Sequence, residues 1–288
     1  MRLADSSGAA KWKKKTARAE IIQLVLCTRQ GQNRGGQPLK KGVDSLKFAA
    51  GTDKGLLREI NEDSCRIIPG CSSSPYVFII ADGMGGHKCG EIASSMTVDY
   101  ISGLMRNDDG RFESENMQQE LCSIVEQANK AVYEKSQDSD EFSGMGTTLT
   151  MAVIGEKTLT AAHVGDSRLY LVRGGEIKQL TEDHSYIGEL LKNGTLTREE
   201  AENHPRKNVI TRAIGSSPEI QVDIFNQEIN ENDIYVLCTD GLTNMVCDNE
   251  IFEIVRDSEP ETACSKLIEA ANRQGGDDNI TVIVIKCE

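Results

Sequence analysis

The stretch Tyr76–His87, YVFIIADGMGGH, constrains the fold more than any other part of this sequence. Its apolar run Tyr76–Ile80 has the composition of a buried strand, and the run leads almost directly into Asp82. A carboxylate at the end of a buried strand loses its hydration, so it needs hydrogen-bond partners, a cationic neighbour or a metal ion. On its own, an Asp-Gly pair followed by two further glycines, Gly85 and Gly86, is also a signal for a sharp turn.

The same layout of a strand and a terminal aspartate recurs along the chain. Asp240 follows the run YVLCT, and Asp166 follows AAHVG. Asp278 stands just before the C-terminal run ITVIVIK, and Asp63 stands just before a strand of its own. In an antiparallel sheet the end of one strand lies beside the start of its neighbour, so these aspartates can converge at one edge.

Five aspartates at one edge repel one another unless cations neutralise them. Oxygen ligands without a cluster of Cys or His suit hard octahedral ions, Mg²⁺ or Mn²⁺, rather than zinc. A pair of such ions held by carboxylates is a recurrent device for hydrolysing phosphate esters. The phosphate oxygens also need a cation, and Arg58, which precedes Asp63 by five residues, can supply a planar fork for two of them.

The pattern of the remaining segments predicts an α+β fold. Strands are expected at residues 46–52, 64–68, 76–80, 147–154, 158–164, 168–173, 176–179, 220–225, 234–238 and 280–286, and helices at 91–106, 116–135, 248–257 and 261–274. Short turns at residues 155–157 and 174–175 separate several strands, which indicates antiparallel pairing. Antiparallel sheets with helices on their outer faces are therefore favoured over a doubly wound parallel sheet.

The N-terminal segment differs in charge from the rest of the chain. Residues 1–50 hold 11 Lys and Arg against 3 Asp and Glu, which gives +8; the whole chain carries −13, so the other 238 residues carry −21. We expect residues 1–45 to be a basic, flexible extension with one candidate helix around Trp12–Cys27, and residues 46–288 to form the globular domain. An acidic body of this kind is a poor match for nucleic acid.

Cysteine usage and hydropathy point to the cytoplasm. The nine cysteines include no C-x-x-C pair, and their odd number does not suit a disulfide framework, so we interpret them as reduced thiols. No apolar run approaches the roughly 18 residues needed to cross a bilayer, and the N-terminus lacks the features of a signal peptide. We expect a cytoplasmic monomer without a transmembrane segment.

Six motifs in fixed order carry a family resemblance. They are GTDKGLLREINEDS (51–64), ADGMGGH (81–87), GMGTTLTMAVI (144–154), AHVGDSRLYLVRGGEIKQLTEDHS (162–185), CTDGL (238–242) and GGDDNITVIVIK (275–286). This set resembles the type 2C, metal-dependent Ser/Thr protein phosphatases, and its spacing is most similar to that of their compact bacterial branch. The resemblance covers residues 46–288 and implies a four-layer αββα fold, a β-sandwich of two antiparallel sheets flanked by helix pairs. It also implies a dinuclear Mn²⁺ or Mg²⁺ centre at one end.

The resemblance implies a role for each matching acidic residue. Asp82 would bridge both metal ions, and the Gly83 carbonyl would bind one of them. Asp240 and Asp278 would complete the shell of the first ion. Asp63 matches the acidic residue that contacts the second ion.

Further positions match a weaker metal site and the substrate site. Asp166 would hold a third ion that it shares with Asp240. Arg58 would bind the phosphate group. Residues 185–213 would form a flap beside the cleft, with His204 in it as a candidate substrate-binding residue.

The implied activity is hydrolysis of phosphoserine and phosphothreonine by a metal-bridging hydroxide, without a phosphoenzyme. In eukaryotic relatives a histidine that can protonate the leaving group directly follows the Asp-Gly pair, whereas Met84 stands there in this chain. Either His87 or a metal-bound water is left for that role. Every expected acidic position is filled, which argues against an inactive family member.

Phosphorylated proteins are the expected substrates, and a Ser/Thr kinase that the enzyme counteracts is the expected partner. A close variant would act on an anti-anti-sigma-like regulator. A different class remains open, namely a non-catalytic module of the same fold that binds phosphoproteins or senses metal. The basic N-terminal segment could also tether the chain to nucleic acid or membrane.

Overall fold

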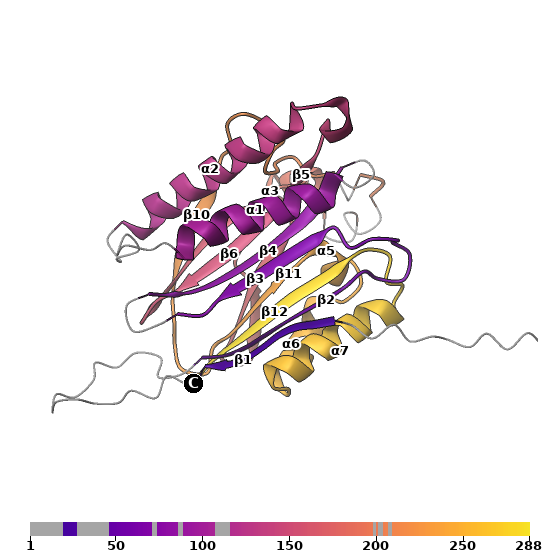
Figure 1. Ribbon diagram of the computed structural model, residues 1–288. Coiled ribbons are helices and arrows are strands. Elements are labelled where there is room, and N and C mark those ends of the chain that lie inside the picture. Colours follow the sequence, from indigo (N-terminus) through magenta and orange to yellow (C-terminus); the bar gives the residue numbers. More distant parts are fainter. Residues whose placement is uncertain are drawn as a thin grey trace, which may run out of the picture.

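Two antiparallel β-sheets pack face to face in the computed structural model of this chain (Figure 1). The structure describes residues 20–27, 46–70, 74–85, 89–106, 116–197, 200, 204–206 and 209–288. In spatial order, the first sheet contains β1 (Glu20–Cys27), β2 (Leu46–Asp53), β12 (Ile280–Cys287), β11 (Ile234–Cys238), β8 (Arg168–Arg173) and β9 (Glu176–Gln179). The second contains β10 (Asp223–Glu228), β7 (Thr158–Val164), β6 (Leu149–Ile154), β4 (Tyr76–Met84) and β3 (Asp63–Ile68), with the short strand β5 (Gly146–Thr147) paired to β4.

Helices cover the outer face of each sheet, so the molecule has four layers (Figure 1). The helices α1 (Cys89–Arg106) and α2 (Met117–Ser136) lie over the second sheet, and α6 (Asp248–Arg256) and α7 (Pro260–Arg273) lie over the first. Shorter helical segments are η1 (Asp140–Phe142), α3 (Tyr186–Lys192) and α5 (Asp240–Thr243). The predicted αββα architecture is confirmed.

Strand β4 shows why the central strands are apolar throughout. Phe78 and Ile80 point between the two sheets, whereas Val77 and Ile79 point toward α1 and α2. Because successive side chains of a strand point to opposite faces and both faces are covered, neither face tolerates polar residues. The strand can therefore become polar only where it leaves the core, and Asp82 lies close to that end.

The N-terminal helix expected around Trp12–Cys27 is wrong over Glu20–Cys27. These residues form β1, which pairs antiparallel with β2 in a register that places Leu24 opposite Ala49. The sequence EIIQLVLC combines β-branched and other apolar residues, and a neighbouring strand edge with free hydrogen-bonding groups settles the choice in favour of a strand. The first sheet therefore begins before residue 46. Residues 12–19 of the expected helix lie outside the described residues.

Two local expectations within the globular part also change. The Asp82-Gly83 pair does not form a turn, because β4 continues through it to Met84 and Gly83 pairs with Thr147 of β5. The strand expected at residues 220–225 begins instead at Asp223. No helix in the described part of the chain is both long and apolar enough to cross a membrane.

Candidate metal centre

The predicted aspartates come from both sheets and meet at one end of the sandwich. Asp63 begins β3 and is the register partner of Asp82 in β4. Asp240 follows β11, and Asp278 precedes β12, which pairs antiparallel with β11. A hydrogen bond joins the two sheets here, because the Thr239 hydroxyl donates to Asp63 Oδ2 at 2.9 Å.

Burial and mutual repulsion dominate the electrostatics of this cluster. Burial raises the pKa of Asp63 to about 7 and that of Asp166 to about 8. It also raises the pKa of Asp82 far above the ordinary range, and the charges of Asp63, Asp240, Asp166 and Asp278 raise it further. Burial likewise raises the pKa of Asp240. All four other aspartates therefore act on Asp82, which stands at the centre of the group.

Three of these carboxylates keep a buried oxygen without a hydrogen-bond partner, namely Oδ1 of Asp63, Asp166 and Asp240. Each such atom costs on the order of 1–3 kcal/mol. Within the described residues, no three Asp, Glu, His or Cys side chains already converge in the geometry of a bound ion. Mg²⁺ keeps several waters and needs only one or two carboxylates, so a set of oxygen atoms of this kind fits hard divalent cations.

Asp82 and Gly83 are held in place through the backbone. The Asp82 N–H donates to Thr148 Oγ1 at 2.9 Å, and the Asp82 carbonyl accepts from Thr147 Oγ1 at 2.8 Å. A Cβ atom on Gly83 would lie 2.1 Å from the carbonyl oxygen of Gly90, so only glycine lets β4 pass this close to the start of α1. The expected role of the Gly83 carbonyl as a metal ligand stays a prediction.

Glu62 is a further member of the cluster that the sequence analysis did not single out. Its side chain is buried, and its Oε1 atom has no hydrogen-bond partner. Burial raises the pKa of Glu62, although the charge of Arg58 and the backbone N–H groups at the start of α1 lower it. The available signal was the pair of adjacent acidic residues, Glu62 and Asp63, directly before a strand.

Arg58 lies beside Asp278. The guanidinium group is half-exposed and forms an ion pair with Asp278 Oδ2 at 2.7 Å. The loop that carries it is tied to the same place by Asn279, whose side-chain amide donates to the carbonyls of Lys54 and Ile60. Because exposed ion pairs contribute little stability, Arg58 can exchange this partner for another anion at small cost.

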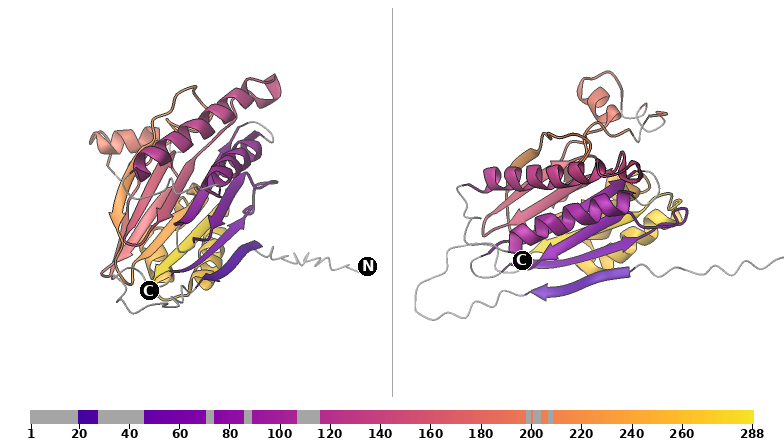
Figure 2. Two further views of the ribbon diagram at one scale, coloured as in Figure 1. Left: turned by 60° about the vertical axis from the view of Figure 1, so that its left-hand side comes forward. Right: turned by 45° about the horizontal axis from the view of Figure 1, so that its top comes forward.

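The structure does not bring His204 to the cluster. Its ring lies 6.0 Å from that of Tyr186 in α3, and its Nδ1 accepts from the Arg206 N–H at 3.1 Å. The right-hand view of Figure 2 shows α3, in salmon, projecting away from the sheets. Among the described contacts of His204, none reaches an aspartate, so its substrate role stays a prediction. His87 lies outside the described residues.

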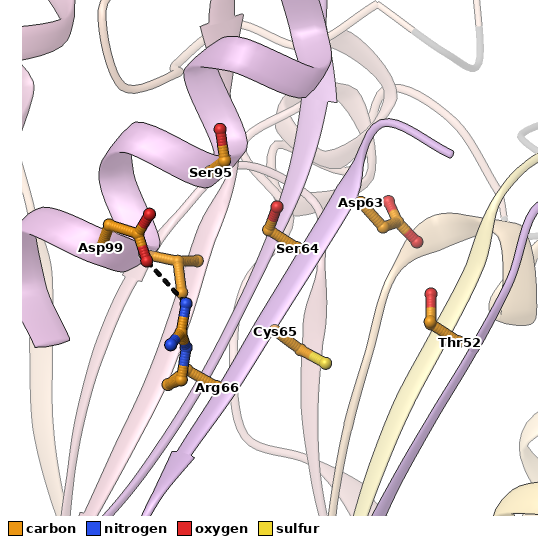
Figure 3. Close-up of a pocket in the computed structure, with 8 residues that line it drawn as sticks. Thr52, Asp63, Ser64, Cys65, Arg66, Ser95 and Asp99 are labelled. Carbon is orange, nitrogen blue, oxygen red and sulfur yellow. Dashed lines mark hydrogen bonds and ion pairs between the residues drawn. The ribbon is translucent and has the colours of Figure 1, made fainter. Parts of the chain in front are cut away.

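A cavity of about 210 Å³ lies on the outer side of Asp63, between β2, β3 and α1 (Figure 3). It is lined by Thr52, Asp63, Ser64, Cys65, Arg66, Ser95, Val98 and Asp99. An ion pair of 2.6 Å between Arg66 and Asp99 borders it on the side away from Asp63 (Figure 3). The cavity can hold several water molecules next to Asp63.

Known proteins are similar to this chain in sequence and in fold. A family model described as protein phosphatase 2C matches residues 57–270. The serine/threonine phosphatase stp of Listeria monocytogenes is 39% identical over 236 residues, which make up 82% of this chain and 93% of that protein. The crystal structure of the serine/threonine phosphatase Stp1 from Staphylococcus aureus matches with a TM-score of 0.81 at 33% identity, covering 88% of this chain and 99% of that one. The catalytic domain of the phosphatase PstP, solved with two manganese ions, matches with a TM-score of 0.74 at 35% identity. This match covers 84% of the present chain and 97% of the PstP chain.

Proposed function

The chain belongs to the protein phosphatase 2C family, and on this premise we propose that it is a metal-dependent protein serine/threonine phosphatase. The observation that carries the proposal is the group of aspartates that both sheets bring to one end of the sandwich, three of which hold a buried oxygen without a hydrogen-bond partner. A fold optimised for stability alone would not collect like charges in its interior. In phosphoric monoester hydrolysis, such a group of carboxylates would hold the cations that the reaction needs.

The proposed cofactor is a pair of Mn²⁺ or Mg²⁺ ions. Asp82 and the Gly83 carbonyl would hold them together with Asp240, Asp278 and Asp63. Asp166 and Asp240 would hold a third ion. When bound, such cations supply Lewis-acid stabilisation of phosphoryl oxygens and make a water molecule more acidic. The PstP structure with two manganese ions supports this assignment.

The protein's own residues would orient the substrate. Arg58 would release Asp278 and bind two phosphate oxygens through its planar fork. The Asp82 carboxylate stays in place because its backbone is bonded to Thr147 and Thr148. His87 is one candidate to protonate the leaving serine or threonine oxygen, and a water molecule is the other.

The proposal also covers the substrates, the partner kinase, the cellular location and the oligomeric state. Phosphorylated proteins would be the substrates, with selection by the flap at residues 185–213 and His204. A cognate Ser/Thr kinase, a role in signal transduction, a cytoplasmic location and a monomeric state belong to the same hypothesis. Residues 46–288 would be the catalytic domain, since the family match at residues 57–270 lies inside it. No feature of the described residues favours the alternative of a non-catalytic binding or metal-sensing module.

The decisive experiment measures hydrolysis of p-nitrophenyl phosphate and of a phosphothreonine peptide by the full chain with added Mn²⁺. We expect turnover that EDTA abolishes and that excess Mn²⁺ restores. Activity that is insensitive to EDTA would contradict the metal assignment. Binding of the phosphopeptide without any phosphate release by the wild-type chain would favour the non-catalytic alternative.

A further inference from the structure

His184 stands at the junction between the flap, residues 185–213, and the turn that carries Asp166. Its backbone N–H donates to the Gly165 carbonyl at 2.7 Å. Its own carbonyl accepts from the N–H of Thr211, at the other end of the flap, at 2.8 Å. One residue therefore links both ends of the flap to the turn between β7 and β8.

The side chain of His184 repeats this link. The imidazole is buried with 7% exposure, and its Nδ1 atom lies 3.0 Å from the Gly165 N–H. Because a backbone N–H can only donate, Nδ1 must be the acceptor, and the neutral ring carries its proton on Nε2. Burial lowers the pKa of His184, which favours this neutral form. The Nε2–H group then donates to Asp223 Oδ2 at 3.1 Å. Arg212 Nη1 lies 3.0 Å from the same Nε2 atom, and because both groups are donors, Arg212 donates to Asp223 and Gln221 instead of to the ring.

Asp223 connects the two ends of the flap to the sheet. Its second oxygen, Oδ1, accepts from Arg212 Nη1 at 2.8 Å, and the same nitrogen donates to the Gln221 carbonyl at 3.2 Å. Asp223 itself begins β10, where it is the register partner of His163 in β7. His184, directly before the flap, and Arg212, near its end, are thus bound to opposite oxygens of one carboxylate on a strand.

The Gly165 turn packs against Thr148, which in turn is hydrogen-bonded to Asp82 of the proposed metal centre. Gly165 has a φ of +109°, and a Cβ atom there would lie 2.6 Å from the Thr148 methyl group, so the turn packs directly against Thr148. The Thr148 hydroxyl accepts from the Asp82 N–H at 2.9 Å. A continuous series of short contacts therefore runs from His184 through Gly165 and Thr148 to Asp82.

We propose that His184 is a positioning residue, whose Nδ1 acceptor fixes the flap against the Gly165–Asp166 turn and so sets where a phosphoprotein meets the metal centre. This inference rests on the proposed phosphatase function. It assigns the effect to one hydrogen-bond acceptor rather than to the volume of the ring.

Two substitutions separate the two ring nitrogens. In His184→Asn the side-chain oxygen can take the place of Nδ1 and still accept from Gly165, whereas the contact with Asp223 is lost. In His184→Gln the amide reaches the place of Nε2, and the acceptor for Gly165 is lost. For a phosphothreonine peptide relative to p-nitrophenyl phosphate, we expect H184Q to raise KM on the order of tenfold and H184N to stay near wild type.

Hydrogen exchange of the metal-free protein provides a readout that does not depend on activity. We expect the amides of Gly165 and Thr211 to exchange faster in H184Q and to stay protected in H184N. If H184Q does not fold, H184N alone decides, because loss of Gly165 protection in that variant overturns the proposal. Equal behaviour of the two variants in both measurements overturns it as well. A wild-type chain without Mn²⁺-dependent hydrolysis would reject the phosphatase function, while the exchange data would still judge the role of His184.

Discussion

Asp63 and Asp82 are register partners on the neighbouring antiparallel strands β3 and β4. Directly opposed residues of such a pair point to the same face of the sheet, and like charges in this relationship destabilise it. The charge of Asp63 also raises the pKa of Asp82. The pair is therefore costly for the metal-free fold, and the proposed binding of cations by these carboxylates would offset that cost.

Replacing Asp82 should move activity and stability in opposite directions. Asp82→Asn removes the central carboxylate, so we expect kcat/KM with Mn²⁺ to fall more than about 100-fold. In EDTA the same variant should unfold at a higher temperature than wild type, because the substitution removes a carboxyl whose ionisation burial and four neighbouring aspartates oppose. Asp138→Asn, at an exposed position paired with Lys135, is the matched control and should change neither quantity. A metal-free D82N protein that melts below wild type would contradict this account.

The metal-free protein should lose stability as the pH rises from about 6.5 to 8.5. Burial raises the folded-state pKa of Asp63 to about 7 and that of Asp166 to about 8, so their stabilising contribution is complete only at low pH and disappears as they ionise in the fold. His163 does not interfere in this window, since burial lowers its pKa to about 4.

Thermal melts in EDTA and in excess Mn²⁺ across this window would measure the effect. Mn²⁺ should raise the melting temperature more at pH 8.5 than at 6.5, because its ligands are then ionised. Asp166→Asn should flatten the pH dependence in EDTA. A wild-type melting temperature that increases through this window in EDTA would refute the prediction.

Arg58 should contribute to phosphate binding rather than to folding. Loss of charge-assisted hydrogen bonds in Arg58→Ala should lower kcat/KM for p-nitrophenyl phosphate by roughly 10- to 100-fold, mainly through KM. Arg58→Lys keeps the charge without the planar fork and should fall in between. The melting temperature should change little, since the Arg58 side chain is about half-exposed. Inhibition by inorganic phosphate provides a direct check, and unchanged inhibition of R58A would count against the assignment.

Two glycines near and within α1 should respond to alanine with opposite signs. A Cβ on Gly83 would meet the Gly90 carbonyl oxygen at 2.1 Å, so Gly83→Ala should cost about 3 kcal/mol or more of unfolding free energy. Gly103, in α1, has open space around its Cβ position, and Gly103→Ala should add about 0.5–1 kcal/mol through helix propensity. Urea denaturation of both variants tests this pair, and a G83A protein as stable as wild type would show that β4 and α1 can separate.

Much of this protein could be predicted from its sequence. Apolar runs and helical spacing predicted most strands and the four main helices, because each of these signals is local. The position of Asp82, Asp166, Asp240 and Asp278 at strand ends was equally local. Antiparallel order allows those ends to meet, and the sequence therefore predicts that an acidic cluster can form there.

Only the tertiary structure decided which segments, far apart in the sequence, pair or pack with one another. Gly83 is part of a strand rather than a turn because Thr147 pairs with it, and Glu20–Cys27 is a strand because β2 offers it an edge. Glu62 lies next to the start of α1 and close enough to Asp278 for that charge to raise its pKa, which places it in the acidic cluster. Strand ends are fixed by hydrogen-bond partners, and the pKa values of the carboxylates are fixed by burial. Both depend on residues far apart in the sequence, so neither could be predicted from a local pattern.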